Sequence, residues 1–254
     1  MPQAWFYADV GNSAVKLAWT PSLARKRPWA KQWTWLEESH RWQDLPKEPA
    51  NWLVSSVHPR RLKWLSHRLK ARRPRDTLRV LALDEIPMTV AVDEPRRLGI
   101  DRVLAAWAAW TLNGSKGPLI VLQAGTAVTV NIVDEQGTFR GGLIFPGLDL
   151  CRRVLAEQTA ALPNRQQSRW PAPTSDKLPA VGRNTEEAID LGTLHHQIGG
   201  MVHSVEHAQQ EFQKRARVYV GGGGLADLSP WLPKSYLREP DLVLLAISNL
   251  AKLS

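Results

Sequence analysis

The chain has 254 residues, of which 43% are hydrophobic and 22% charged, so it has room for one large globular domain or two of ordinary size. No apolar run reaches the roughly 18–20 residues of a membrane span, Asp9 interrupts the region where a signal peptide would be apolar, and Cys151 is the only cysteine. We therefore expect a cytoplasmic protein without an intramolecular disulfide or a cysteine-based zinc site, whose net charge of +9 favours anionic partners.

Short apolar segments open the chain. Residues 5–11 and 14–20 flank a Gly-Asn turn, which predicts a hairpin. Residues 50–59 have the character of a buried strand that ends at a proline, and residues 77–83 predict another strand. A helix should begin near Asp101 and end near residue 113.

The densest basic segment is "RRLKWLSHRLKARRPR", residues 60–75. Its leucines follow helical spacing, so the simplest interpretation is an amphipathic surface helix over 60–73 with arginines in solvent. The alternative is a nucleic-acid footprint, because basic residues and tryptophans are interleaved there. We favour the surface helix and do not expect nucleic acid as a partner.

The second half repeats the opening pattern. Residues 117–148 predict three strands joined by a Gly-Thr turn and a Gly turn, and "LQAGTAVTVNIV" parallels "ADVGNSAVKLAW". Two α/β domains of similar plan are expected, 1–113 and 114–254. Residues 161–184 predict a long irregular connection, followed by helices over 185–214. Residues 216–232 begin as a strand that runs into four glycines, and a final helix from residue 241 is expected to pack on the second half.

Five segments in order, 7–19, 96–110, 119–148, 182–201 and the glycine run 221–224, resemble the type III pantothenate kinases. The resemblance implies two ribonuclease-H-like domains, as in actin and acetate kinase, with a cleft between them. It also implies a homodimer that transfers the γ-phosphate of ATP to pantothenate, the first step of coenzyme A synthesis, with Mg²⁺ accompanying ATP.

The first motif, "DVGNSAVK", resembles the family's first phosphate loop. A Gly-Asn turn exposes backbone N–H groups to phosphate oxygens, and an aspartate oxygen suits Mg²⁺, directly or through water. The alternative is an ordinary hairpin whose lysine points into solvent. The residues expected to bind phosphate are Asp9, Val10, Gly11, Asn12, Ser13, Ala14, Val15 and Lys16.

The second motif, "GIDR", resembles the family's G-x-D-R, in which the aspartate is the catalytic base and the segment binds pantothenate. A carboxylate can accept the proton of an attacking hydroxyl, and arginine can bind a carboxylate or phosphate in bidentate fashion. The alternative for the aspartate is a helix N-cap. The resemblance therefore assigns Asp101 as base and Gly99, Ile100, Asp101 and Arg102 to the acceptor site.

Two positions depart from the family pattern. Gln123 stands where the family usually has an aspartate that coordinates K⁺ or NH₄⁺, so a monovalent cation site there would lack its anionic charge. Val92 stands where a tyrosine commonly lines the pantothenate pocket. Thr126, by contrast, matches a threonine that contacts ATP.

Two later motifs have both a functional and a structural interpretation. Thr185 in "GRNTEEAI" matches a threonine that contacts pantothenate across the dimer, although the same residues also fit a helix start. The glycines 221–224 resemble a turn beside adenosine, or form a plain strand-to-helix turn. His195 and His196 lack metal-ligand spacing, and Asp149 is expected to be structural.

These residues support an ATP-dependent pantothenate kinase as the leading hypothesis. A kinase of the same fold with another small acceptor remains open because of Gln123 and Val92. A catalytically weak accessory or regulatory protein is the third possibility.

Overall fold

The computed structural model describes residues 4–23, 29–35, 41–164, 170 and 177–253. They divide into two units. Unit 1 comprises residues 1–88, 94–108 and 241–254, and unit 2 comprises 89–93 and 109–240. This division differs from the expected one at residue 113, because the C-terminal helix belongs to unit 1 and a short segment before the G-x-D-R motif belongs to unit 2.

Unit 1 is built on a five-stranded sheet of order β3-β2-β1-β4-β5. The first three strands are antiparallel neighbours, while β1 pairs in parallel with β4 and β4 with β5. Its elements are β1 (Ala4–Val10), β2 (Val15–Thr20), β3 (Lys31–Trp35), η1 (Arg41–Asp44), β4 (Ala50–Ser56), α1 (Pro59–Arg72), β5 (Thr77–Val80), η2 (Leu83–Glu85), η3 (Pro95–Arg97), the first part of α2 (Ile100–Leu112), and α6 (Leu242–Leu253).

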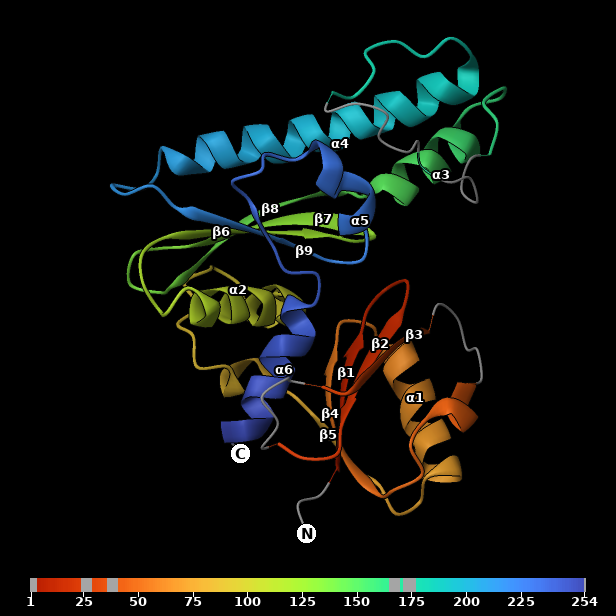
Figure 1. The fold of residues 1–254 in the computed structure, drawn as a ribbon, viewed down its shortest axis with the longest axis vertical. Coiled ribbons are helices and arrows are strands. Elements are labelled where there is room, and N and C mark those ends of the chain that lie inside the picture. Colours follow the sequence, from red (N-terminus) through yellow and green to blue (C-terminus); the bar gives the residue numbers. More distant parts are fainter. Residues whose placement is uncertain (1–3, 24–28, 36–40, 165–169, 171–176, 254) are drawn as a thin grey trace. The chain divides into compact units, whose positions relative to one another are not determined.

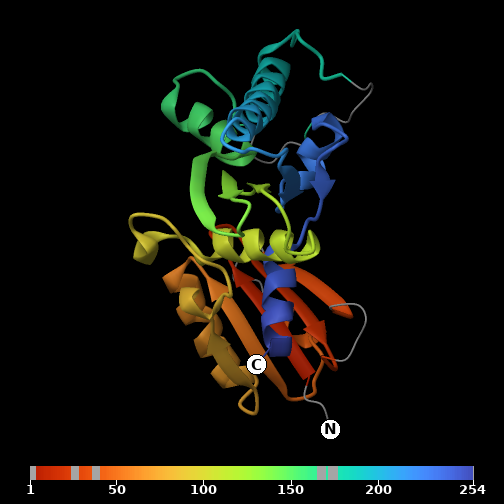
Figure 2. The same cartoon turned by 90° about the vertical axis from the view of Figure 1, so that its left-hand side faces the viewer.

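Helices α1 and α6 cover opposite faces of this sheet (Figures 1 and 2). Because side chains alternate along a strand, β1 sends Phe6 and Ala8 to the α1 face, where they are fully buried with Trp52 and Leu65. Phe6 stacks on Trp52, with ring centroids 4.3 Å apart. Asp9 therefore points to the other face of the sheet, the one that α6 covers.

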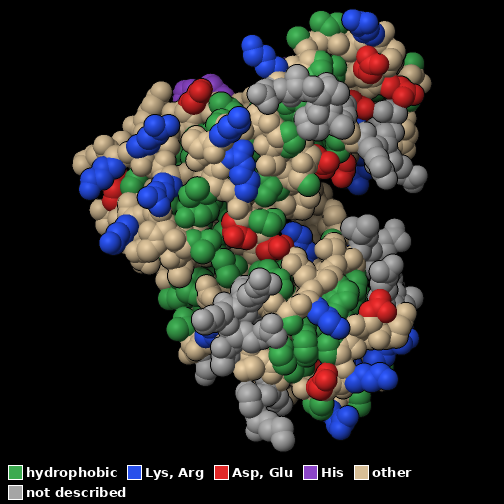
Figure 3. Space-filling model, viewed as in Figure 1, with side chains coloured by type: hydrophobic (Ala, Val, Ile, Leu, Met, Phe, Trp, Pro, Cys, Tyr) green, Lys and Arg blue, Asp and Glu red, His purple; other side chains and the backbone are tan. Residues whose placement is uncertain are grey.

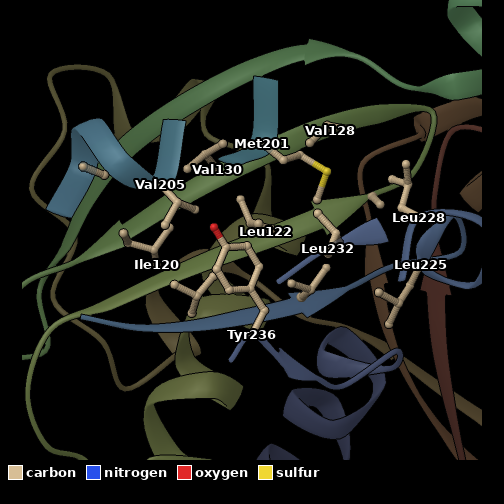
Figure 4. Packing of buried hydrophobic residues seen from close by; sticks show 14 of the residues in the cluster. Ile120, Leu122, Val128, Val130, Met201, Val205, Leu225, Leu228, Leu232 and Tyr236 are labelled. Carbon is tan, nitrogen blue, oxygen red and sulfur yellow. The ribbon is translucent and has the colours of Figure 1, made fainter. Parts of the chain in front are cut away.

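Unit 2 repeats the arrangement with the sheet order β10-β9-β6-β7-β8. Long helix α4 packs on β6 and β7, and its Met201 and Val205 meet Ile120, Leu122 and other apolar side chains of the sheet (Figure 4). Its elements are the last part of α2, β6 (Leu119–Ala124), β7 (Ala127–Val133), β8 (Phe139–Pro146), α3 (Leu148–Gln158), α4 (Thr185–Gln209), β9 (Arg217–Gly221), α5 (Leu225–Leu228), η4 (Ser229–Trp231) and β10 (Leu237–Arg238).

The two sheets share one topology, which confirms the repeat and the α/β fold class expected from the sequence. In each, a three-stranded antiparallel meander is extended by two parallel strands, which is the order of a ribonuclease-H-like unit. The predicted hairpin, the helix over 60–73 and the helix near Asp101 are present as β1–β2, α1 and α2. Strand β3 and helix α3 were not predicted.

The expected placement of the last helix is wrong. Helix α6 follows β10 of unit 2 in the chain, but it packs on β1, β2 and β4 of unit 1. Nearly all of its apolar side chains are buried there. An apolar helical pattern predicts that a helix is covered, but not which sheet covers it.

The irregular connection over 161–184 lies partly outside the described residues. Its described residues, 161–164, 170 and 177–184, form neither helix nor strand. Within the described part of the chain, no helix is both long and apolar enough to cross a bilayer.

The packing of α6 leads to a prediction about stability. Ile247 is fully buried in this helix, whereas Leu253 near its end is 71% exposed. Ile247→Ala should lower the free energy of unfolding by about 2–5 kcal/mol, because it removes buried methylenes and leaves a cavity. Leu253→Ala should change it by less than about 0.5 kcal/mol. Urea unfolding measures both values, and equal effects would contradict the assignment of α6 to a core.

Candidate active site

The first phosphate motif forms the turn between β1 and β2. The Gly11 N–H donates to the Ala14 carbonyl over 2.9 Å, and Asn12 and Ser13 are exposed at its tip. Arg61 of α1 donates from Nη1 to the Gly11 carbonyl over 3.1 Å. Arg61 of α1 therefore fixes the turn while the tip of the turn stays exposed. This arrangement is compatible both with a phosphate loop and with an ordinary hairpin.

Four charged side chains of unit 1 come together beside this turn. Asp9 and Lys16 are directly opposite each other in the β1–β2 register. Lys16 Nζ lies 3.8 Å from Oδ1 of Asp241, the residue that precedes α6. Gln32 Nε2 donates to the same oxygen over 2.9 Å. Asp101, from the first turn of α2, adds a third carboxylate to the field at Asp9.

The crowding of carboxylates changes the acidity of Asp9. Loss of hydration on burial, the charge of Asp101 and the charge of Asp241 together raise the Asp9 pKa from 3.8 to about 7, although Lys16 opposes the change. A carboxyl group whose pKa lies near neutrality is only partly ionised at pH 7, and a nearby cation would favour its ionised form. Asp9 is therefore suited to exchange a proton for a metal ion.

Asp101 lies inside the first turn of α2, one residue after the helix begins, so it does not occupy the N-cap position. Its Oδ1 accepts a hydrogen bond from the Arg102 N–H over 2.9 Å. Burial raises the pKa of Asp101, and this hydrogen bond and the Arg102 charge oppose the rise. Burial lowers the pKa of Arg102, and Asp101 opposes that change.

Gly99 leaves room for the Asp101 carboxylate. A Cβ at position 99 would lie only 2.6 Å from Asp101 Oδ1. The Gly99 carbonyl also accepts the Arg102 N–H over 3.1 Å. The glycine of G-x-D-R is thus needed for the position of the carboxylate, while Ile100 is buried behind it.

In unit 2, the second phosphate motif forms the turn between β6 and β7. Gly125 donates to the Ala127 carbonyl over 3.1 Å, and Thr126 is exposed at the tip. Gln123 precedes the turn as Asp9 precedes the turn of unit 1, and it pairs with Thr129 and Gly221 on the neighbouring strands. The repeat therefore carries a carboxylate in one unit and a neutral amide in the other.

The other predicted site residues of unit 2 lie in structural turns. Thr185 is the first residue of α4, and Asn184 caps that helix by accepting the Glu187 N–H over 2.9 Å. In the glycine run, Gly222 has φ +97° and a Cβ there would lie 2.2 Å from the Ala124 carbonyl oxygen, so the run turns closely against β6. Both structural interpretations are therefore present, and neither excludes the functional one.

The remaining candidates belong to unit 2, whereas the carboxylate cluster belongs to unit 1. Val92 lies in unit 2 beside Gly141, and a ring nitrogen of His195 lies 2.8 Å from the Pro179 carbonyl oxygen. No group of three or more His, Cys, Asp and Glu side chains among the described residues is arranged to hold a metal ion.

Asp241 was not predicted from the sequence. The only signal is its place after Pro240 and before an apolar helix, which predicts a helix start and nothing about chemistry. Asp241 affects the pKa of Asp9 because α6, which follows it, packs on the sheet of unit 1.

A repeated sheet of this order defines a duplicated ribonuclease-H-like fold. A sequence model of the family described as type III pantothenate kinase matches residues 5–207. Three proteins named type III pantothenate kinase are similar to the chain. The one from Alkalilimnicola ehrlichii is 30% identical over 98% of both chains, and that from Synechococcus sp. (strain JA-3-3Ab) is 30% identical over 99% of this chain and 93% of its own. That from Rhodopirellula baltica is 36% identical over 68% of this chain and 61% of its own. The chain belongs to the type III pantothenate kinase family.

Solved structures agree on the fold. A putative Baf family transcriptional activator from Campylobacter jejuni aligns with TM-score 0.59 and 18% identity over 98% of both chains. A putative 2-dehydro-3-deoxygalactonokinase from Sinorhizobium meliloti aligns with TM-score 0.58 and 13% identity, over 98% of this chain and 96% of its own. At these identities the likeness concerns the fold alone.

The close approach at Gly99 leads to a prediction about catalysis. Gly99→Ala should displace the Asp101 carboxylate, because the new methyl group would overlap Oδ1, and turnover should fall about tenfold or more if that carboxylate accepts a proton. Stability should change little, since a carboxylate can rotate away. Gly199→Ala is the control, because a Cβ there meets nothing within 4 Å. Steady-state rates and thermal melting separate the two effects, and an unchanged rate in Gly99→Ala would contradict the prediction.

The field at Asp9 leads to a prediction about pH. Because the folded pKa is raised, the folded protein holds a proton between about pH 4 and 7 that the unfolded chain has released, so Asp9 makes the free energy of unfolding fall as pH rises through this range. Asp241→Asn should lower the Asp9 pKa, since it removes a negative charge and leaves Lys16 unneutralised. Carbon-13 NMR titration, with Asp9→Asn for assignment, measures the pKa.

The matched control is Asp84→Asn, which removes an exposed carboxylate elsewhere in unit 1. It should leave the Asp9 pKa unchanged. An Asp9 pKa that is the same in Asp241→Asn and in the natural protein would show that the two carboxylates do not interact.

Proposed function

We propose that this chain transfers the γ-phosphate of ATP to the primary hydroxyl of pantothenate, giving 4′-phosphopantothenate for coenzyme A biosynthesis. The family assignment supports this reaction. The observation that carries the proposal is the group of Asp9, Lys16 and Asp101 beside an open turn in unit 1. Phosphoryl transfer depends mainly on positioning and charge neutralisation, and these residues supply both.

Asp101 is the proposed general base. The hydroxyl of the acceptor loses its proton as its oxygen attacks phosphorus, and the Asp101 carboxylate accepts that proton. A raised pKa makes the carboxylate a stronger base than an exposed aspartate while the Arg102 N–H fixes its orientation. Arg102 is the proposed partner of the acceptor's carboxylate, together with the backbone of Gly99 and Ile100.

Asp9, Lys16 and the turn between them are the proposed phosphate site. Backbone N–H groups of the turn would face phosphate oxygens, and Lys16 would neutralise charge. Asp9 suits Mg²⁺, because this cation prefers oxygen ligands and is usually held by one or two carboxylates together with substrate phosphates. Bound Mg²⁺ would neutralise phosphate charge during transfer.

Unit 2 carries the other residues that the resemblance assigns to ATP. Thr126 at the exposed β6–β7 turn is the proposed contact to ATP, and the glycines 221–224 the proposed seat of adenosine, where missing side chains admit the base. Gln123 would offer a neutral carbonyl oxygen to K⁺ or NH₄⁺ in place of a carboxylate. We therefore propose a monovalent cation requirement that is weaker than the family's.

We also propose a homodimer in the cytoplasm. An apolar groove of about 540 Å³ runs between α3 and α4 and is lined by Cys151, Val154, Leu155, Ile189 and Thr185. Thr185 is the residue that the resemblance assigns to the acceptor site of the other subunit, so a second copy is the occupant that suits this groove. Light scattering should give the mass of a dimer, and an active monomer would contradict this part of the proposal.

One observation favours a second acceptor class. Val92 replaces the tyrosine expected beside pantothenate, so the pocket could take another small alcohol. Incubation of the purified protein with ATP, Mg²⁺ and pantothenate, followed by mass spectrometry, separates the two. Formation of 4′-phosphopantothenate supports the proposal, and its absence with every monovalent cation tested would reject it.

The role of Asp101 leads to a quantitative prediction. Asp101→Asn keeps the size of the side chain and can still accept the Arg102 N–H, but it cannot take up the proton. Turnover should fall about 10²–10⁴-fold while ATP binding and thermal stability remain close to those of the natural protein. The control is Asp84→Asn, the same exchange at an exposed position. Near-normal turnover of Asp101→Asn would reject Asp101 as the base.

The amide at Gln123 leads to a prediction about K⁺. A carboxylate about 4 Å from a monovalent cation contributes roughly 4 kcal/mol at an effective dielectric near 20, and dehydration of the ion offsets much of it. Gln123→Asp should therefore lower the K⁺ concentration needed for half-maximal activity. A K⁺ titration at constant ionic strength, with Na⁺ as replacement, measures it. Strong activation of the natural protein by low-millimolar K⁺, unchanged in Gln123→Asp, would contradict the prediction.

A further inference from the structure

A cavity in unit 1 has no place in the proposed reaction. It has a volume of about 420 Å³ and is formed by the end of α1, the turn into β5 and the segment that joins η1 to β4. Volumes of this order accommodate small ligands. The lining residues are Trp42, Gln43, Leu45, Lys47, Pro49, Arg72, Arg73, Pro74, Arg75 and Asp76.

One wall of this cavity is fixed by Arg73. Its guanidinium donates from Nη1 to the Pro46 carbonyl over 2.6 Å and from Nη2 to the Glu48 carbonyl over 2.7 Å, and its Nε contacts Asp76. Asp76 in turn accepts the Trp52 Nε1–H over 2.7 Å. Arg73 and Asp76 therefore bond to each other and to neighbouring groups. These bonds connect the end of α1 to the segment before β4.

The other cations of the lining have no partner within the described residues. The side chains of Lys47, Arg72 and Arg75 are exposed and make no hydrogen bond or ion pair with any described residue. Four cations therefore face one carboxylate, and that carboxylate is already paired. Figure 3 shows several Lys and Arg side chains on the surface that α1 forms. The lining of the cavity therefore carries more positive than negative charge.

Trp42 gives the cavity an apolar wall. Its ring lines the cavity, is only 7% exposed and packs against Trp35, with ring centroids 5.2 Å apart. An anion with several oxygens could lie against this wall and contact the surrounding cations.

The cavity lies at the opposite end of the sheet from the proposed active site. Asp76 Oδ1 accepts the N–H of Ala50, which is paired with Ala4 at the start of β1, whereas Asp9 is paired with Ser55 near the end. Five residues of strand separate the two levels, about 16 Å. An anion in this cavity therefore cannot be the phosphate chain held by the turn after Asp9.

We propose that this cavity binds a small polyphosphate anion, such as the di- or triphosphate group of a metabolite, at a site separate from catalysis. Several closely spaced negative charges are needed to engage Lys47, Arg72 and Arg75 together. Arginine suits the role because its planar guanidinium donates two parallel hydrogen bonds to one phosphate group. The field of the site should also draw such anions in from solution.

The test is calorimetric titration of the full chain with inorganic tripolyphosphate at constant ionic strength. The natural protein is compared with Arg75→Gln and with Lys63→Gln, which removes an equal charge from the exposed face of α1 outside the cavity. Arg75→Gln should weaken one binding event about tenfold or more, whereas Lys63→Gln should leave it nearly unchanged. The KM for ATP should stay the same in both variants, which shows that the weakened event is not the nucleotide site.

Three outcomes would overturn the proposal. The first is a titration of the natural protein whose every binding event is retained in Arg75→Gln. The second is equal weakening by Arg75→Gln and Lys63→Gln, which would mean a diffuse field of α1. The third is tighter binding of a single-stranded oligonucleotide than of tripolyphosphate, weakened equally by both variants, which would favour a nucleic-acid surface. The binding measurement does not depend on which acceptor the enzyme phosphorylates.

Discussion

The confinement of three carboxylates beside one lysine is the interaction on which this account depends. Asp9 and Asp101 come from β1 and α2, and Asp241 directly precedes α6. Lys16 only partly offsets the effect of the Asp101 and Asp241 charges on the pKa of Asp9. Such an arrangement costs folding free energy, because charged groups lose water and face like charges. It is also what prepares the site for a cation, because a cation would offset the negative charges.

The return of α6 to unit 1 makes this arrangement possible. The helix follows the last strand of unit 2, yet its apolar face covers the sheet that contains Asp9. Because α6 starts at that sheet, Asp241 reaches Lys16 and Gln32. The last helix thus has two roles, since it closes the core of unit 1 and sets the charge of its site.

The repeat shows where the two units differ in chemistry. Asp9 and Gln123 occupy equivalent places before equivalent turns, as the matching sheet orders show. In unit 1 the carboxylate has Lys16 opposite it, whereas in unit 2 the amide has Thr129 opposite it. One turn therefore follows a carboxylate and the other a neutral amide.

The sequence predicted local features well and long-range packing poorly. The β1–β2 hairpin, α1, and the strands around Gly125 follow from turn residues and from apolar periodicity, which are properties of short segments. Strand β3, "KQWTW", was missed because only one of its five residues is buried, which leaves a weak pattern. Asp241 was missed because its partners lie at the other end of the chain. Motif resemblance proposed Asp9 and Asp101 as site residues, but it did not predict that the charge of Asp101 raises the pKa of Asp9.

A double-mutant cycle on Asp9 and Asp101 tests the central claim most directly. The rate constant kcat/KM is measured for the natural protein, Asp9→Asn, Asp101→Asn and the double variant, with folding checked by thermal melting. If the two carboxylates act in one electrostatic unit, the double variant should lose at least tenfold less than the product of the two single losses, because groups in one charged cluster are not additive. Losses that multiply would show that Asp9 and Asp101 act independently and would contradict the account.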